Sequence, residues 1–144
     1  SISRTRLIIK GHTRGDTIDE ERSNQLSAKS NVVVNCELES PQLSQWADIV
    51  INFGSSIAIE SIFLGKHVIY TPFLHTNTTI FDKSGAVHSA DSIGSVVSII
   101  QNIQSGLLKP PTRSSIDQLL KSEVYTDINP HDVATRYMSF LTNK

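Results

Sequence analysis

Residues 47–72 read ADIVINFGSSIAIESIFLGKHVIYTP, and this stretch decides the fold. Its β-branched runs at 48–53 and 67–71 predict two buried strands. The apolar segment between them predicts a helix over 56–64, with Gly65 as its left-handed stop. The sequence therefore predicts a strand, a tight Gly-Ser-Ser turn, a helix and a second strand, which together make one βαβ unit.

The turn Gly54-Ser55-Ser56 carries the first candidate site. It places free backbone N–H groups and two hydroxyls at a helix start, where an anion is favoured. Glu60 follows one helical turn after Ser56 on the same face, about 6 Å further along. We expect a phosphate on the turn and the ribose hydroxyls of a nucleotide on Glu60.

Structural roles for the same residues are the alternative. The two serines could simply cap the helix. Glu60 stands among apolar neighbours, which predicts a poorly solvated carboxylate that needs a partner. That partner would be a ribose or a structural group such as Lys66 or a backbone amide.

The rest of the chain continues the alternation of strands and helices. Further strands are expected at 7–10 and 31–35, with a weak one at 86–88, and helices at 19–30, 40–46, 91–103, 114–120 and 130–141. Ser40 is predicted to cap its helix, with Pro41 at the first helical position. Trp46, just before a buried strand, is predicted to lie in the core.

This alternation predicts the fold class. Strands separated by helices imply βαβ crossovers and a parallel sheet. We predict a Rossmann-like α/β fold in which the four strands up to residue 71 form one parallel sheet with helices on both faces. The loops after the first, third and fourth strands are expected at one edge, and residues 1–144 are expected to form a single domain.

Composition limits the classes of function. The chain of 144 residues has 13 lysines and arginines against 14 aspartates and glutamates, so a footprint for nucleic acid is not indicated. A single cysteine, Cys36, rules out an internal disulfide and fits a reducing compartment. No apolar run reaches the roughly 18 residues of a transmembrane helix. We expect a soluble, cytoplasmic domain.

Basic and histidine-containing loops follow two of the predicted strands. His12, Thr13 and Arg14 follow the first strand and His75 follows the fourth, where carboxyl ends of parallel strands open onto a crevice. Ordinary solvated loops and a surface histidine are the alternatives. The five histidines show no metal-ligand spacing and no Asp-x-Asp is present, so we expect no metal site. His67 and His88 are expected to be strand residues.

The stretch resembles the C-terminal nucleotide-binding domain of GT-B glycosyltransferases of the bacterial capsule and surface-polysaccharide type. The shared order is a strand, Gly-Ser-Ser, a helix that contains Glu60, then Gly-Lys-x-Val-Ile and Pro72. The similarity extends to the related UDP-N-acetylglucosamine 2-epimerase fold. The resemblance covers residues 5–105. It implies that Ser55 and Ser56 hold the donor's phosphates and Glu60 the ribose. His12 matches a Lys-x-His-Pro loop of such families, although Thr13 replaces the proline.

The resemblance also implies a function. It indicates the donor-binding half of a metal-independent glycosyltransferase for surface polysaccharide or glycolipid synthesis, with a nucleotide-sugar as substrate and no cofactor. The catalytic base is then expected on an N-terminal acceptor domain or partner subunit outside this chain, and the full protein is expected to associate peripherally with a membrane. The helix at 130–141 would partly face that missing domain. A nucleotide-sugar 2-epimerase, a glycerophosphotransferase and a non-catalytic nucleotide-binding subunit remain alternatives.

Overall fold

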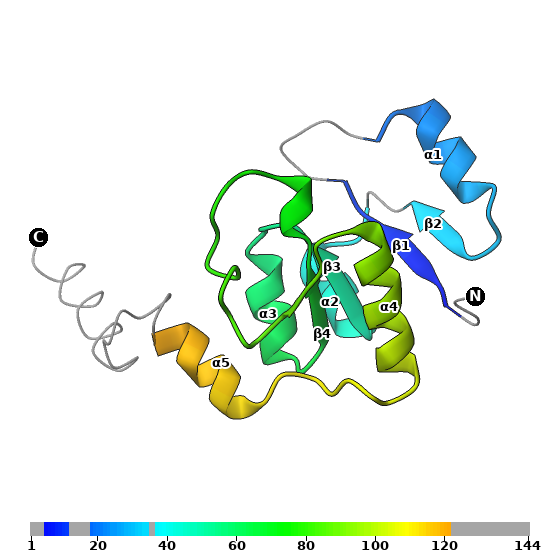
Figure 1. The fold of residues 1–144 in the computed structure, drawn as a ribbon. Coiled ribbons are helices and arrows are strands. Elements are labelled where there is room, and N and C mark those ends of the chain that lie inside the picture. Colours follow the sequence, from blue (N-terminus) through cyan, green and yellow to red (C-terminus); the bar gives the residue numbers. More distant parts are fainter. Residues whose placement is uncertain (1–4, 12–17, 35–36, 122–144) are drawn as a thin grey trace, which may run out of the picture.

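Strands and helices alternate along the chain in the computed structural model, which describes residues 5–11, 18–34 and 37–121 (Figure 1). The strands are β1 (Leu7–Ile9), β2 (Val32–Val34), β3 (Ile49–Asn52), β4 (His67–Tyr70) and β5 (His88–Ser89). The helices are α1 (Glu20–Ser27), α2 (Ser40–Trp46), α3 (Ile57–Phe63), α4 (Ile93–Gln104) and α5 (Arg113–Leu119), with a short 3-10 helix at Pro72–Leu74. Each element predicted within the described residues is present, and the helix predicted at 130–141 lies outside them.

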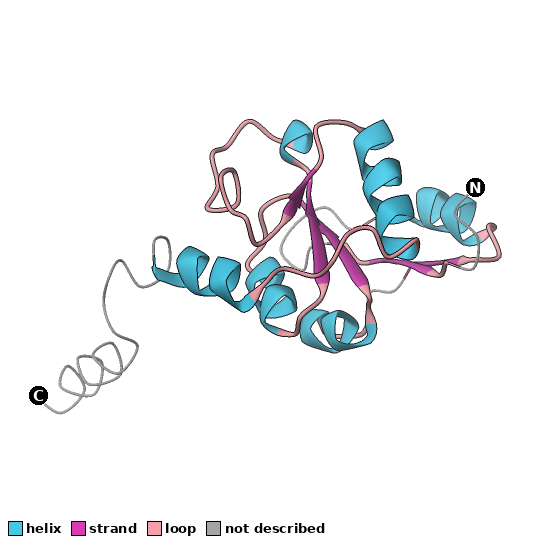
Figure 2. Ribbon diagram, turned by 60° about the horizontal axis from the view of Figure 1, so that its bottom comes forward, coloured by secondary structure: helices cyan, strands magenta, loops and turns pink. Residues whose placement is uncertain are grey.

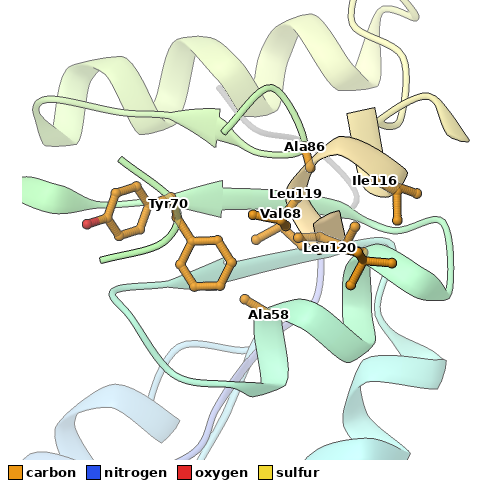
Figure 3. Close-up of a cluster of buried hydrophobic side chains, with 9 residues drawn as sticks. Ala58, Val68, Tyr70, Ala86, Ile116, Leu119 and Leu120 are labelled. Atoms are coloured by element: carbon orange, nitrogen blue, oxygen red, sulfur yellow. The ribbon is translucent and has the colours of Figure 1, made fainter. Parts of the chain in front are cut away.

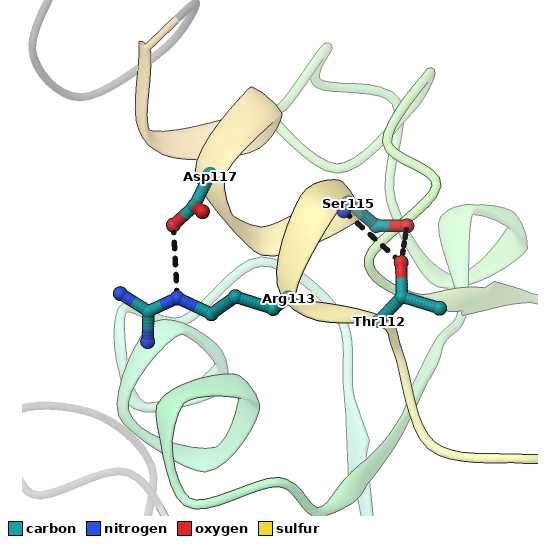
Figure 4. Close-up of polar contacts among 4 residues, drawn as sticks. All are labelled: Thr112, Arg113, Ser115 and Asp117. Atoms are coloured by element: carbon teal, nitrogen blue, oxygen red, sulfur yellow. Dashed lines mark hydrogen bonds and ion pairs between the residues drawn. The ribbon is translucent and has the colours of Figure 1, made fainter.

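Side-chain caps begin three of the helices. Asp19 accepts a hydrogen bond from the backbone of Arg22 at α1, and Ser92 accepts one from the backbone of Ser95 at α4. At α5, Thr112 Oγ1 accepts from the Ser115 N–H at 3.2 Å (Figure 4). These bonds satisfy N–H groups that a helix start leaves without an intrahelical partner.

The start of α2 differs from the prediction. Ser40 is the first helical residue rather than the cap, and Glu39 holds the cap position with an extended backbone. The Gln42 side chain accepts from the Glu39 N–H at 3.2 Å. The hydrogen bond from the Glu39 backbone to the side chain of the third helical residue is half of a capping box. The helix therefore begins one residue earlier than predicted.

All strand pairing in the described residues is parallel, but it forms two sheets. β1 pairs with β2, and β3, β4 and β5 form a second sheet in that order. The prediction that the first four strands form one sheet is therefore wrong. A cavity of about 670 Å³ lies where the two sheets meet, lined by residues of β1, β3, α2, α4 and the start of α3, and no ladder pairs β1 with β3.

The larger sheet has helices on both faces. Figures 2 and 3 place α4 on one side of β3 and β4 and α3 on the other. On the α3 side, Val68 and Tyr70 of β4 pack with Ala58 and Ile62 of α3 and with side chains of α5. Because side chains alternate along a strand, His67 and Ile69 face the α4 side. The parallel α/β class is confirmed for the described residues.

Trp46 does not belong to this core. Its side chain is 53% exposed and lines the cavity between β1 and β3, so the prediction of a buried tryptophan is wrong. The last residue of α2 is exposed because α2 packs mainly against α3, and the neighbouring strand edge is unpaired. No helix of the described residues has both the length and the apolar character to cross a membrane.

Candidate functional site

The Asn52 side chain stabilises the turn after β3 by hydrogen bonds to its backbone. The Asn52 side chain is buried, and its Oδ1 accepts hydrogen bonds from the Gly54 N–H at 2.6 Å and the Ser55 N–H at 2.9 Å. This side chain closes the turn in the manner of an Asx turn. Two of the backbone donors that the sequence offered to an anion are thus already occupied.

The donors that remain belong to the next two residues. Among the hydrogen bonds of the described residues, none uses the backbone N–H of Ser56 or Ile57. The side chains of Ser55 and Ser56 are exposed, and Ser56 at the cap position makes no side-chain capping bond. Ser56 therefore holds the cap position, as the structural alternative predicted, but without the side-chain hydrogen bond of a helix cap. α3 has only seven residues, so its dipole adds little beyond these local groups.

Glu60 is exposed on α3, against the expectation from its apolar neighbours. The helix turns those neighbours, such as Ala58 and Ile62, toward the core and leaves the glutamate outside. The alternative partner Lys66 donates instead to the backbone carbonyl of Gln45 at 2.9 Å. Within the described residues the carboxylate has no hydrogen-bond or ion-pair partner, and it is accessible to a ligand.

Beside the turn, a cluster of polar side chains surrounds the Tyr70 hydroxyl at the end of β4. Thr79 Oγ1 donates to this hydroxyl at 2.9 Å, and the hydroxyl donates to Asp82 Oδ1 at 3.2 Å. His75 Nε2 lies 3.2 Å from the same oxygen. Because the tyrosine proton is directed to Asp82, this contact requires a proton on His75 Nε2. Asp82 also accepts from the Thr79 N–H, the largest cause of the lowered pKa of its carboxyl.

This assignment leaves one ring nitrogen of His75 without a partner. Nδ1 is covered from solvent and has no hydrogen bond to any described residue. It carries a lone pair when Nε2 is protonated, and a ligand would have to displace the covering groups to donate a hydrogen bond to it. His75 is therefore more than a surface histidine of the loop after β4.

Gly54 connects the turn to this cluster. Its φ of 126° suits glycine, and a Cβ built on it would lie 3.3 Å from Thr79 Cγ2 and 4.0 Å from His75 Nε2. The turn after β3 and the loop after β4 are thus in direct contact at the carboxyl edge of the sheet. His12, Thr13 and Arg14, predicted to reach the same edge, lie outside the described residues.

Two cavities of the described residues lie near this turn, and neither is lined by Gly54, Ser55 or Ser56. A cavity of about 270 Å³ lies between the loop 78–85 and α5, and touches Thr79 and Asp82 of the cluster. The larger cavity is bounded by β1, β3, α2 and α4, and it reaches Ile57 at the start of α3. Because Ser55, Ser56 and Glu60 are all exposed, a ligand on them would be contacted by this chain on one side only.

The sequence reasoning found Gly54, Ser55, Ser56, Glu60 and His75 but missed Asn52, Tyr70, Thr79 and Asp82. The Asn-x-Gly spacing at 52–54 was a usable signal for the Asx turn. Nothing in the local sequence indicated the tyrosine cluster. No group of three or more potential metal ligands is found among the described residues. The chain matches no protein-family model, and comparison with curated proteins and with solved structures gave no match.

Proposed function

We propose that this chain is the donor-nucleotide-binding domain of a metal-independent glycosyltransferase for surface polysaccharide or glycolipid synthesis. The observation that carries the proposal is the contact between the Gly54–Ser56 turn and the His75 loop at the carboxyl edge of β3 and β4. In open parallel sheets, ligands bind at this edge.

Each group has a role in the proposal. The N–H groups of Ser56 and Ile57 and the serine hydroxyls bind the donor's phosphates, and Glu60 accepts hydrogen bonds from the ribose diol. His75 lies beside the turn, where its contact with the Tyr70 hydroxyl positions the imidazole. His12, Thr13 and Arg14 supply further donors and positive charge, as the resemblance to GT-B enzymes implies.

In sugar transfer, negative charge develops on the departing nucleotide phosphate. Preorganised N–H and O–H donors can stabilise that charge without a metal. The base that activates the acceptor belongs to a second domain or partner subunit, which would also cover the open face of this site. We therefore expect this chain to bind nucleotide but to transfer no sugar by itself. In the cell the full protein is cytoplasmic and associates peripherally with the membrane.

Calorimetric titration with UDP, CDP, GDP and CMP tests the proposal. One of these is expected to bind, and Glu60→Gln should weaken the ribonucleotide by about 10-fold or more, because a charged hydrogen bond contributes roughly 1.5–3 kcal/mol. The 2′-deoxy counterpart should lose less. Glu20→Gln on α1 is the matched control, since it removes an exposed carboxylate elsewhere.

Three outcomes would contradict the proposal. The first is that no nucleotide binds at millimolar concentration. The second is that Glu60→Gln and Glu20→Gln leave equal affinity, which would remove the ribose role of Glu60. The third is sugar transfer by the purified 144-residue chain alone, which would show that acceptor site and base are present.

A further inference from the structure

The cavity of about 670 Å³ lies beside the unpaired edges of β1 and β3. Leu7 and Ile8 line it in succession, and so do residues 48–51. Successive side chains of a strand point to opposite faces of a sheet, so an unbroken run of lining residues places the cavity at the edge of the strand rather than over one face. The cavity therefore lies within the layer of the two sheets.

Backbone hydrogen-bonding groups of both strands are directed toward this cavity. Asp48 and Asn52 accept ladder bonds from β4 and its end, and in a parallel ladder the residues between them alternate in direction. Ile49 and Ile51 therefore direct their N–H and C=O groups away from β4. On β1 the Leu7 N–H donates to the strand side of β2, so Ile8 directs its groups the other way. Among the described residues these groups have no hydrogen-bond partner.

Apolar side chains of two helices close the cavity from the two faces of the sheet layer. Leu43 and Trp46 of α2 line it, and so do Ile100 and Ile103 of α4. α2 packs against α3, which lies on the face of the larger sheet opposite α4 (Figure 2). Strand edges on two sides and apolar helices on the other two are the surroundings of a central strand in a parallel sheet.

We propose that this cavity binds an extended apolar segment of a partner polypeptide, which adds a strand between β1 and β3. The free N–H and C=O groups of Ile8, Ile49 and Ile51 would pair with its backbone. A small apolar ligand would leave those groups unpaired, which favours a strand. β3 carries no charged residue or proline, by which natural edges resist pairing. The site is separate from the Gly54–Ser56 turn and does not depend on the proposed function.

Titration of the full chain with the peptide acetyl-Lys-Val-Ile-Val-Ile-Lys-amide tests this site. Its four apolar residues match the four residues of β3, and the lysines oppose pairing of the peptide with itself. Trp46 is the single tryptophan of the chain and is 53% exposed, so its emission should shift to shorter wavelength when the peptide covers it. We expect one saturable peptide at submillimolar concentration.

Amide hydrogen exchange shows whether the backbone carries the binding. The N–H groups of Ile8, Ile49 and Ile51 should exchange more slowly with the peptide present, whereas that of Ser56, outside the cavity, should be unchanged. A peptide with both isoleucines N-methylated keeps the side chains but loses the N–H groups along one edge. It should bind about 10-fold more weakly or worse, because two hydrogen bonds contribute roughly 0.5–1.5 kcal/mol each.

Leu43→Asn on α2 and Ile103→Asn on α4 place a polar group in the apolar walls and should each weaken the peptide about 10-fold. Ile93→Asn is the matched control, because Ile93 begins the same helix α4, is 74% exposed and does not line the cavity. Circular dichroism checks that each variant is folded.

The proposal is overturned if the parent chain does not bind the peptide. It is also overturned if the N-methylated peptide binds as tightly, since the cavity would then accept any apolar ligand. Unchanged exchange at Ile49 and Ile51, or equal affinity of the folded Ile103→Asn and Ile93→Asn variants, would place the peptide elsewhere on the chain and overturn it as well.

Discussion

Replacing Asn52 by alanine is expected to lower the free energy of unfolding by about 2 kcal/mol. The substitution removes one oxygen that accepts from two backbone N–H groups, those of Gly54 and Ser55. Each such bond contributes roughly 0.5–1.5 kcal/mol net, which gives about 1–3 kcal/mol for the pair. Because Asn52 is only 6% exposed, its truncation also leaves a small void beneath the turn.

Urea denaturation measures this effect. The midpoint should fall while the dependence of the free energy on urea stays unchanged, and the melting temperature should fall by about 4–8 °C for a domain of this size. Ser55→Ala is the matched control in the same turn. Its exposed hydroxyl has no hydrogen bond to a described residue, so its loss should change stability by no more than about 0.5 kcal/mol. Equal urea midpoints for Asn52→Ala and Ser55→Ala would refute the conclusion that the Asn52 side chain stabilises this turn.

Gly54→Ala should destabilise the chain more than Gly65→Ala: both have positive φ, but only at Gly54 would a Cβ meet a neighbour, Thr79, at 3.3 Å, whereas nothing lies within 4 Å at Gly65. Chemical denaturation compares the two, and an equal loss would show that contact with Thr79 has no energetic weight. Stability should fall as the pH decreases below 6.5, the ordinary pKa of histidine, because burial lowers the pKa of His67 and His88 and the unfolded chain takes up protons first. Replacing both His67 and His88 by glutamine should make the free energy of unfolding depend less on pH. An unchanged pH dependence in this double variant would contradict the prediction.

Local pattern alone predicted the elements around the candidate site. The β-branched runs and Gly65 placed β3, α3 and β4 within a residue or two of their bounds, because strand, turn and helix signals act over neighbouring residues. The same pattern misjudged Glu60. An apolar composition does not say which side of a short helix meets the core, and the packing of α3 on β4 leaves this carboxylate outside.

Contacts between distant residues were decided only by the tertiary structure. His67 and His88 are 21 positions apart and meet through the parallel register of β4 and β5. Tyr70 meets Asp82 because the loop after β4 folds back onto its end. The lack of pairing between β1 and β3, with a cavity lined by residues of both strands and of α2 and α4, is likewise a property of several elements together. Such contacts depend on register and on volume filled by several elements at once, and local propensity carries no information about either.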